Sequence, residues 1–143
     1  MTPSGSPASN GTIDRERRAR VAVVEDDANG RLLARVILED LYDVVVYETG
    51  AEALEGIARA GADLVLLDVL LPDLDGTEVV RRIRADAALR GLPVIALTAH
   101  AMAGDREALL AAGFDDYVAK PLLDESVLLH AIEALLAARR RRS

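Results

Sequence analysis

The chain has 143 residues and a formal net charge of −7; 51% of its residues are hydrophobic but only 3% are aromatic. A chain of this length forms one domain that buries about 70% of its unfolded surface. It contains no cysteine, which excludes a disulfide scaffold and a thiolate metal site and is typical of a reducing compartment. No apolar run approaches the roughly 18 residues of a membrane span, and no secretory signal is visible. We therefore expect a cytoplasmic protein without a membrane segment.

Charge is unevenly distributed along the chain. Residues 21–138 carry 9 basic and 22 acidic groups, whereas residues 139–142 form a run of four arginines. The excess of acidic groups in residues 21–138 argues against nucleic-acid binding by the folded part. The arginine run is open to contact with a nucleic acid or an acidic partner, although a solvated helix end is the favoured interpretation. Lys120 is the only lysine among 17 basic residues, which indicates a position that requires a compact ammonium.

From Arg20 onward, short apolar runs alternate with longer segments of helical period. This alternation predicts parallel strands covered by helices, an α/β fold. The expected strands are residues 20–25, 43–47, 63–68, 92–97 and 115–119. Three of them are apolar at consecutive positions, as strands buried on both faces are. Right-handed crossovers favour a five-stranded, doubly wound parallel sheet in the order 2-1-3-4-5.

Helix signals stand between these runs. Thr49 and Glu52 have the spacing of a capping box, and Gly61 ends the helix that they begin. Asp75 and Glu78 open the next helix in the same way. These signals predict helices on the crossovers between successive strands.

The chain is expected to consist of three parts. Residues 1–19 are rich in small and polar residues and predict a disordered arm. Residues 20–138 form the domain, whose last helix is expected over residues 124–139. Residues 139–143 then form a basic C-terminal tail.

Polar residues stand at the carboxyl ends of four expected strands. They are Glu25, Asp26, Asp68, Thr98 and Lys120. The carboxyl ends of parallel strands meet at one edge of the sheet, near its switch point, which is the usual ligand site of this architecture. Two carboxylates about 4 Å apart repel by ~4 kcal/mol at an effective dielectric constant of 20, so such a cluster needs a cation. Oxygen ligands without cysteine or clustered histidine favour Mg²⁺.

Asp68 is the best candidate for a nucleophile in this cluster, because it ends the most apolar strand. Attack of a carboxylate on phosphorus gives an aspartyl phosphate. Thr98 and Lys120 can then bind the phosphoryl oxygens, the first by a neutral and the second by a charge-assisted hydrogen bond.

Four segments of the chain resemble the signatures of response-regulator receiver domains. They are residues 23–27 (VVEDD), 66–76 (LLDVLLPDLDG), 96–101 (ALTAHA) and 117–121 (YVAKP). The resemblance extends from about Arg20 to Ala138, with the signatures in the family's order. It implies a flavodoxin-like (βα)5 fold of the single-domain receiver type.

The resemblance also implies a role for each site residue. Asp68 accepts a phosphoryl group from a histidine kinase or a histidine phosphotransfer protein. Mg²⁺ is held by Glu25, Asp26, Asp68 and the backbone carbonyl of Leu70. The phosphoryl group is bound by Thr98, the Ala99 amide and Lys120. Tyr117 is the aromatic residue that swings inward as Thr98 moves. Such a domain catalyses only its own phosphorylation and dephosphorylation.

Two other functions stay open at this point. Residues 73–77 (DLDGT) spell the nucleophile signature of haloacid-dehalogenase-like phosphatases, with Asp73 as the nucleophile. That signature follows a strand directly, whereas here Pro72 precedes it, and proline does not fit a central strand. The third possibility is an interaction module that does not use phosphorylation. Nucleotide or flavin binding is disfavoured, because no glycine-rich loop follows the first strand.

The output of the domain is expected to be contact with a downstream protein or phosphoryl relay, because no further domain follows in this sequence. The first expected helix holds more apolar residues than one sheet face covers, namely Leu32, Leu33, Val36 and Ile37. We expect its exposed part to dock the phosphodonor. The domain is expected to be a monomer or a weak, phosphorylation-dependent dimer.

Overall fold

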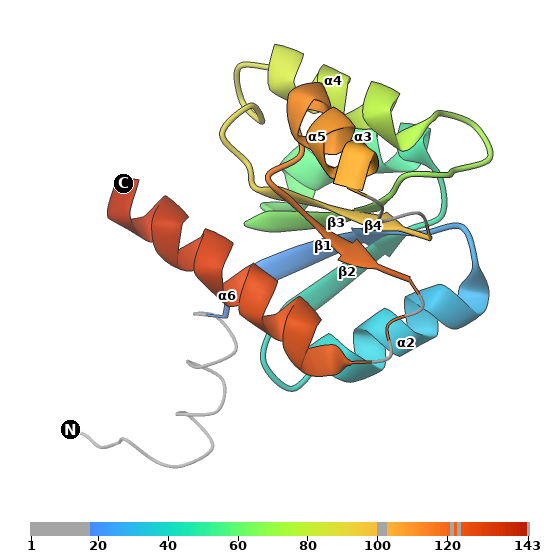
Figure 1. Ribbon diagram of the computed structural model, residues 1–143. Coiled ribbons are helices and arrows are strands. Elements are labelled where there is room, and N and C mark those ends of the chain that lie inside the picture. The colour runs from blue at the N-terminus through green and yellow to red at the C-terminus, as the bar shows by residue number, and fades with distance from the viewer. Residues whose placement is uncertain (1–17, 100–102, 121, 123, 143) are drawn as a thin grey trace.

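The computed structural model describes residues 18–99, 103–120, 122 and 124–142. Five parallel strands form one sheet in the order β2-β1-β3-β4-β5, which confirms the expected topology (Figure 1). The strands are β1 (Arg20–Val24), β2 (Asp43–Tyr47), β3 (Leu64–Asp68), β4 (Val94–Thr98) and β5 (Asp116–Ala119). The expected N-terminal arm lies almost entirely outside the described residues.

Helices cover both faces of the sheet (Figure 1). They are α2 (Ala28–Leu38), α3 (Gly50–Ala60), α4 (Gly76–Ala85), α5 (Ala103–Ala112) and α6 (Glu125–Arg142). Helices α2 and α6 lie on one face, and α3, α4 and α5 lie on the other. This arrangement leaves the carboxyl ends of the strands open at one edge.

Strand β1 shows how the sequence produces two cores. Its side chains point alternately to the two faces, as in any strand. Val21 and Val23 pack with α2 and α6, whereas Ala22 and Val24 pack with α3 and α4. All four are fully buried, which is why this strand is apolar at consecutive positions.

The helix signals hold in part. Thr49 caps α3 by accepting the amide of Glu52 at 3.1 Å, and Gly61 ends that helix with the left-handed φ of 69° that glycine adopts without strain. The reciprocal bond of a capping box differs, because the Glu52 carboxylate accepts the Glu48 amide instead of the Thr49 amide. Asp75 caps α4 through the amide of Thr77.

Glu78 does not complete a capping box at the start of α4. It pairs with two arginines of its own helix, Arg81 and Arg82. Hydrogen bonds from these guanidinium groups lower the pKa of Glu78 to about 2. The expected box is therefore replaced by ion pairs one turn apart.

Several element boundaries differ from the expectation. Strand β1 ends at Val24, although the amide of Glu25 still bonds to the carbonyl of Tyr47. Strand β4 begins at Val94 rather than Leu92. Helix α6 continues to Arg142, so the basic run is the last turn of a helix rather than a tail after it. Positive side chains stabilise the negative end of a helix dipole.

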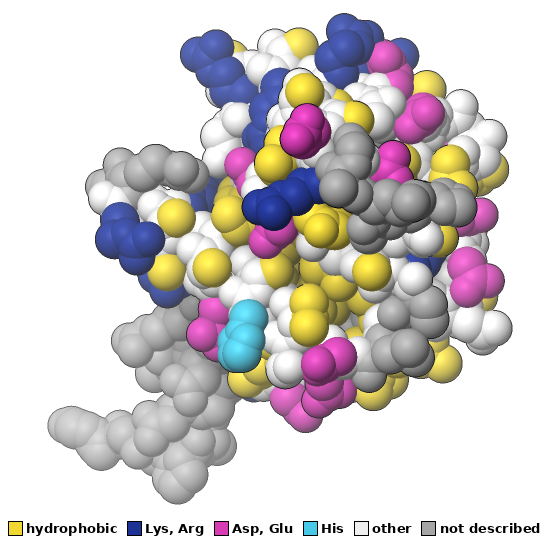
Figure 2. Space-filling view, viewed as in Figure 1, with side chains coloured by type: hydrophobic (Ala, Val, Ile, Leu, Met, Phe, Trp, Pro, Cys, Tyr) yellow, Lys and Arg dark blue, Asp and Glu magenta, His cyan; other side chains and the backbone are white. Residues whose placement is uncertain are grey.

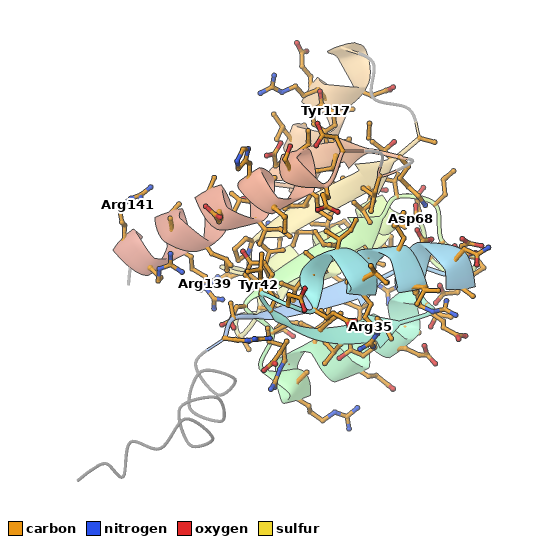
Figure 3. The ribbon with its side chains drawn as sticks, turned by 90° about the horizontal axis from the view of Figure 1, so that it is seen from below. Arg35, Tyr42, Asp68, Tyr117, Arg139 and Arg141 are labelled. Atoms are coloured by element: carbon orange, nitrogen blue, oxygen red, sulfur yellow. The ribbon has the colours of Figure 1, made fainter. Side chains whose placement is uncertain are left out.

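Arg139 also fixes the end of α6 to the sheet. Its guanidinium donates to the backbone carbonyl of Asp63, just before β3, at 2.8 Å. Basic side chains gather where α6 ends, on the left of the space-filling view (Figure 2). Tyr42 and Arg139 both lie toward the end of the sheet opposite Asp68 (Figure 3). The charge of the basic run is thus remote from the acidic strand ends.

Gly76→Ala is expected to destabilise the domain by about 1–3 kcal/mol, the usual cost of overpacking. A Cβ atom at Gly76 would lie 2.6 Å from the carbonyl oxygen of Asp68 and 2.7 Å from the Cα of Val69, and these backbone atoms cannot move aside cheaply. Gly91→Ala is the matched control, because a Cβ atom there meets nothing within 4 Å. Urea unfolding of both variants measures the difference; equal midpoints would contradict the packing argument.

Candidate functional site

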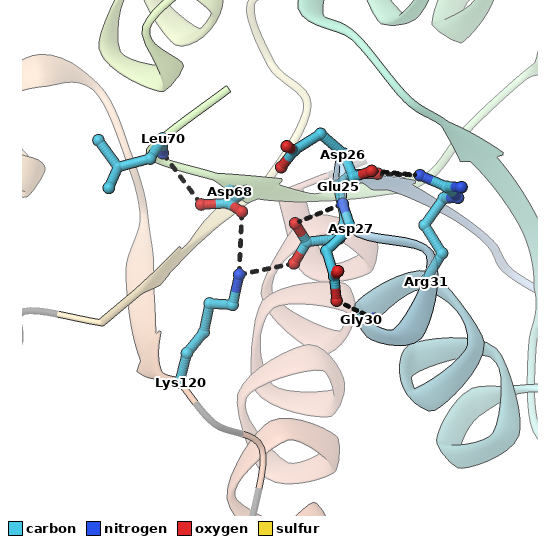
Figure 4. Close-up of polar contacts among 8 residues, drawn as sticks. All are labelled: Glu25, Asp26, Asp27, Gly30, Arg31, Asp68, Leu70 and Lys120. Atoms are coloured by element: carbon cyan, nitrogen blue, oxygen red, sulfur yellow. Dashed lines mark hydrogen bonds and ion pairs between the residues drawn. The ribbon is translucent and has the colours of Figure 1, made fainter. Parts of the chain in front are cut away.

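Three acidic residues and the single lysine meet at the carboxyl edge of the sheet (Figure 4). Asp68 is the last residue of β3, Glu25 and Asp26 follow β1, and Lys120 follows β5. Glu25 and Asp68 are only 2% and 5% exposed, whereas Asp26 is exposed. The parallel topology brings these residues together from positions up to 95 apart in the sequence.

Lys120 bridges two of the carboxylates. Its Nζ donates to Oε1 of Glu25 at 2.7 Å and to Oδ2 of Asp68 at 2.9 Å. Burial opposes the charge of the ammonium, but the hydrogen bonds to Glu25 and Asp68 outweigh this effect and hold the pKa of Lys120 above its ordinary value. The ammonium therefore stays charged beside Asp68, where it can neutralise an incoming anion.

The three carboxylates fit a divalent cation. Glu25, Asp26 and Asp68 each offer an oxygen, and these atoms lie within 4.8 Å of one another. One ammonium does not balance three carboxylates, so the ionised cluster keeps an excess of negative charge at a partly buried place. Hard carboxylate oxygens are the ligands that Mg²⁺ prefers. The charge and the donor type both match that ion.

The side chain of Glu25 occupies space that a side chain at position 30 would fill, and Gly30 leaves that space free. A Cβ atom at Gly30 would lie 2.8 Å from Oε1 of Glu25 and 3.0 Å from its Cγ and Cδ. In the sequence, this glycine is visible only as a residue that weakens the first helix. The structure shows that it gives room to the long side chain of the first acidic residue.

Glu25→Gln is expected to raise the melting temperature of the metal-free protein at pH 8 by roughly 4 °C, the shift that about 1 kcal/mol gives a domain of this size. Burial and the neighbouring Asp68 carboxyl raise the pKa of Glu25 from 4.5 to about 7. A carboxyl with a raised pKa binds its proton more tightly when folded, so its ionisation costs stability as pH rises from about 4.5 to 7. The neutral amide does not carry this cost.

The gain from Glu25→Gln should disappear at pH 4.5, where the carboxyl is protonated in the folded protein. Glu55→Gln, an exposed glutamate on α3, is the control and should leave the melting temperature unchanged at both pH values. Thermal unfolding monitored by circular dichroism at the two pH values measures the effect. A gain that is the same at pH 4.5 and pH 8 would contradict the assigned pKa.

The loop that carries Glu25 and Asp26 is held from several sides. Asp27 caps α2 by accepting the amide of Gly30 at 2.8 Å, and its own amide donates to Oε2 of Glu25 at 3.3 Å. The guanidinium of Arg31 donates to the backbone carbonyls of Glu25 and Asp26. Arg31 was not among the expected site residues, because in the sequence it is one of sixteen arginines and nothing marks it.

The other expected site residues lie on β4 and β5 or shortly after β3 and β4. Thr98 is the last residue of β4 and is buried, and Ala99 follows it and is exposed. The amide of Leu70 donates to Oδ1 of Asp68 at 2.9 Å, while its side chain is 65% exposed. Tyr117 lies on β5, half-buried against the core under α3, α4 and α5 (Figure 3).

Asp73, the nucleophile of the phosphatase alternative, has a different role in the structure. It is exposed, and its two oxygens accept the amides of Gly50 and Ala51 at 3.0 Å each. These hydrogen bonds lower the pKa of Asp73. The carboxylate thus binds the N-terminus of α3, where a negative charge is stabilising, and it belongs neither to the acidic cluster nor to the ion pairs of Lys120. This observation disfavours the phosphatase.

Comparison with known proteins identifies the family. The model of the response regulator receiver domain matches residues 21–133. Sensor protein GacS of Pseudomonas syringae pv. syringae is 38% identical over 131 residues, which cover 89% of this chain and 14% of that protein. Transcriptional regulatory protein ResD of Bacillus subtilis is 38% identical over 125 residues, which cover 87% of this chain and 50% of that protein. The chain therefore spans half or less of the length of these relatives.

Solved structures agree. The receiver domain of the sensor histidine kinase PA1611 of Pseudomonas aeruginosa, whose structure has magnesium coordinated in the active-site cleft, superposes with a TM-score of 0.76 at 36% identity over 84% of this chain and 98% of that one. A CheY-like receiver domain protein of Methanospirillum hungatei gives a TM-score of 0.79 at 29% identity, with 88% and 99% covered. The chain belongs to the response regulator receiver domain family and is a phosphoacceptor domain of two-component signalling.

Proposed function

We propose that Asp68 is the phosphoacceptor, that it takes its phosphoryl group from the phosphohistidine of a histidine kinase or a histidine phosphotransfer protein, and that Mg²⁺ is required. The position of Lys120 carries this proposal, because its ammonium touches the same Asp68 carboxylate that lies in the acidic cluster. A buried carboxylate nucleophile beside a fixed cation suits phosphoryl transfer, because the cation stabilises the negative charge on the phosphoryl oxygens.

In the proposed step, an oxygen of Asp68 attacks the phosphorus of the donor. The P–N bond to the histidine breaks, a P–O bond to the carboxylate forms, and the electron pair leaves with the imidazole. Lys120 then exchanges its contact with the Asp68 oxygen for one with the phosphoryl oxygens. Thr98 and the amide of Ala99 bind the remaining oxygens from the end of β4.

Glu25, Asp26, Asp68 and the backbone carbonyl of Leu70 are the proposed ligands of Mg²⁺. The bound ion supplies positive charge against the oxygens of the phosphoryl group. Three carboxylate oxygens within 4.8 Å of one another support this assignment for Glu25, Asp26 and Asp68. As the membership in the receiver family suggests, the proposed catalysis is limited to the domain's own phosphorylation and dephosphorylation.

The proposed switch runs from Thr98 to Tyr117. Thr98 moves toward the phosphoryl group and Tyr117 follows into the space that it leaves, which changes the surface around β5. Tyr117 is half-buried on β5, next to the strand that Thr98 ends, which supports this coupling. The changed surface contacts a downstream protein or stabilises a weak dimer of an otherwise monomeric domain.

The proposed docking surface for the phosphodonor is the exposed side of α2. Leu32, Leu33 and Val36 are 61%, 41% and 59% exposed, as the sequence predicts for a helix with excess apolar residues. A hollow of about 220 Å³, lined in part by Leu33 and Leu122, connects this surface to Lys120.

No helix among the described residues is long and apolar enough to cross a bilayer. The proposed reaction belongs in the cytoplasm, where ATP-dependent kinases make phosphohistidine.

Incubation with acetyl phosphate and Mg²⁺, followed by intact-mass measurement, tests the proposal. We expect one added phosphoryl group that depends on Mg²⁺ and is lost in alkali, because acyl phosphates hydrolyse readily. Hydrolysis of a phosphomonoester that depends on Asp73 would favour the phosphatase. Neither addition nor hydrolysis would favour the phosphorylation-independent module.

A further inference from the structure

Arg31 lies in the first turns of α2 and turns its side chain back to the loop before the helix (Figure 4). Its Nη1 donates to the backbone carbonyls of Glu25 and Asp26, at 2.9 Å in each case. Its Nη2 forms an ion pair with Glu48, in the segment after β2, at 3.2 Å. The side chain is only 18% exposed, although arginine is usually a surface residue.

These contacts restrain the backbone of two acidic residues at once. The peptide units of Glu25 and Asp26 determine where both side chains leave the loop, and charge-assisted hydrogen bonds to carbonyls are stronger than neutral ones. The ion pair with Glu48 restrains the guanidinium from the other side, so the bond to the loop does not depend on α2 alone. Arg31 touches neither the carboxylate oxygens of the cluster nor Lys120 in any contact that the structure gives.

We infer that Arg31 is a positioning residue for the cation site: it holds the loop backbone so that the carboxylates of Glu25 and Asp26 are preorganised for a divalent cation. This inference rests on the proposed function, since it assigns a role toward the same Mg²⁺. Residues that orient metal ligands typically contribute about 10–100-fold to metal affinity.

Positioning and electrostatics predict opposite signs when Arg31 is neutralised. The guanidinium is a positive charge close to the acidic loop, and by charge alone its removal makes the site more negative and Mg²⁺ binding tighter. Loss of positioning lets the loop sample other conformations, and Mg²⁺ binding becomes weaker. The direction of the change in affinity therefore separates the two roles.

The experiment measures the dissociation constant of Mg²⁺ by isothermal titration calorimetry at fixed ionic strength. The test variants are Arg31→Met and Arg31→Gln, two neutral side chains of different polarity. Arg35→Met is the matched control, because Arg35 is exposed one turn further along α2 (Figure 3) and its side chain has no hydrogen bond or ion pair with the described residues. Melting temperatures of the metal-free proteins are recorded beside the titrations.

We expect the Arg31 variants to bind Mg²⁺ about tenfold more weakly and Arg35→Met to bind it as the wild type does. Unchanged or tighter binding by the Arg31 variants would overturn the inference while leaving the proposed function intact. A lower melting temperature with unchanged affinity would show a merely structural role and would also overturn it. If one variant does not fold, the other decides. A wild-type protein that binds no Mg²⁺ would overturn the proposed function and this inference together.

Discussion

We expect the substitution Asp68→Asn to abolish uptake of the phosphoryl group, and we expect this experiment to be the most decisive one. The amide has almost the same shape as the carboxylate, and its oxygen can still accept a hydrogen bond from Lys120, which contacts Asp68 at 2.9 Å. It is not a nucleophile toward phosphorus, so the loss should be complete rather than partial. Intact-mass measurement after incubation with acetyl phosphate and Mg²⁺ detects the group directly.

Asp73→Asn is the matched control for this experiment. It makes the same chemical change five residues later, at a carboxylate that binds the N-terminus of α3 through Gly50 and Ala51. We expect this variant to take up the phosphoryl group normally and to melt at a lower temperature, because the helix loses its negative cap. Uptake that survives in Asp68→Asn but is lost in Asp73→Asn would contradict the assignment of the phosphoacceptor.

Lys120→Met is expected to have the second largest effect, with phosphorylation slowed by about 10²–10³-fold. Removal of one donor that stabilises developing negative charge typically has this effect on the rate. The same substitution should tighten Mg²⁺ binding, because the carboxylates of Glu25 and Asp68 lose the ammonium that now contacts both. A slower reaction and a tighter metal site from one change distinguish loss of the lysine from loss of the fold.

The rate of phosphorylation by acetyl phosphate and the dissociation constant of Mg²⁺ are both needed to read the Lys120 variant. Arg31→Met provides the contrast, since it also removes one positive charge near the site but is expected to weaken Mg²⁺ binding. Unchanged phosphorylation in Lys120→Met would contradict the proposed role of the ammonium. Weaker Mg²⁺ binding would contradict the charge argument.

Much of the fold could be predicted from the spacing of hydrophobic residues along the chain. Strands such as β1 and β3 are buried on both faces, so they are apolar at consecutive positions and differ clearly from the amphipathic helices between them. Right-handed crossovers favour the observed order of the strands. Two boundaries in particular were predicted wrongly. The expected fourth strand included Pro93, which has no amide to donate in a central strand, and β4 begins directly after it. The expected end of α6 lay within an unbroken run of arginines, where composition marks no boundary.

The sequence by itself determined the α/β sheet and the acidic, hydroxyl and ammonium groups at its strand ends, because a parallel sheet brings its carboxyl ends to one edge whatever the details of packing. Only the tertiary structure decided what three further residues do. Arg31 binds the loop carbonyls, Gly30 makes room for Glu25, and Asp73 caps a helix that begins 23 residues before it. Each role depends on a short distance between two residues that no motif or spacing in the sequence connects. The pattern of hydrophobic residues carries no information about such distances.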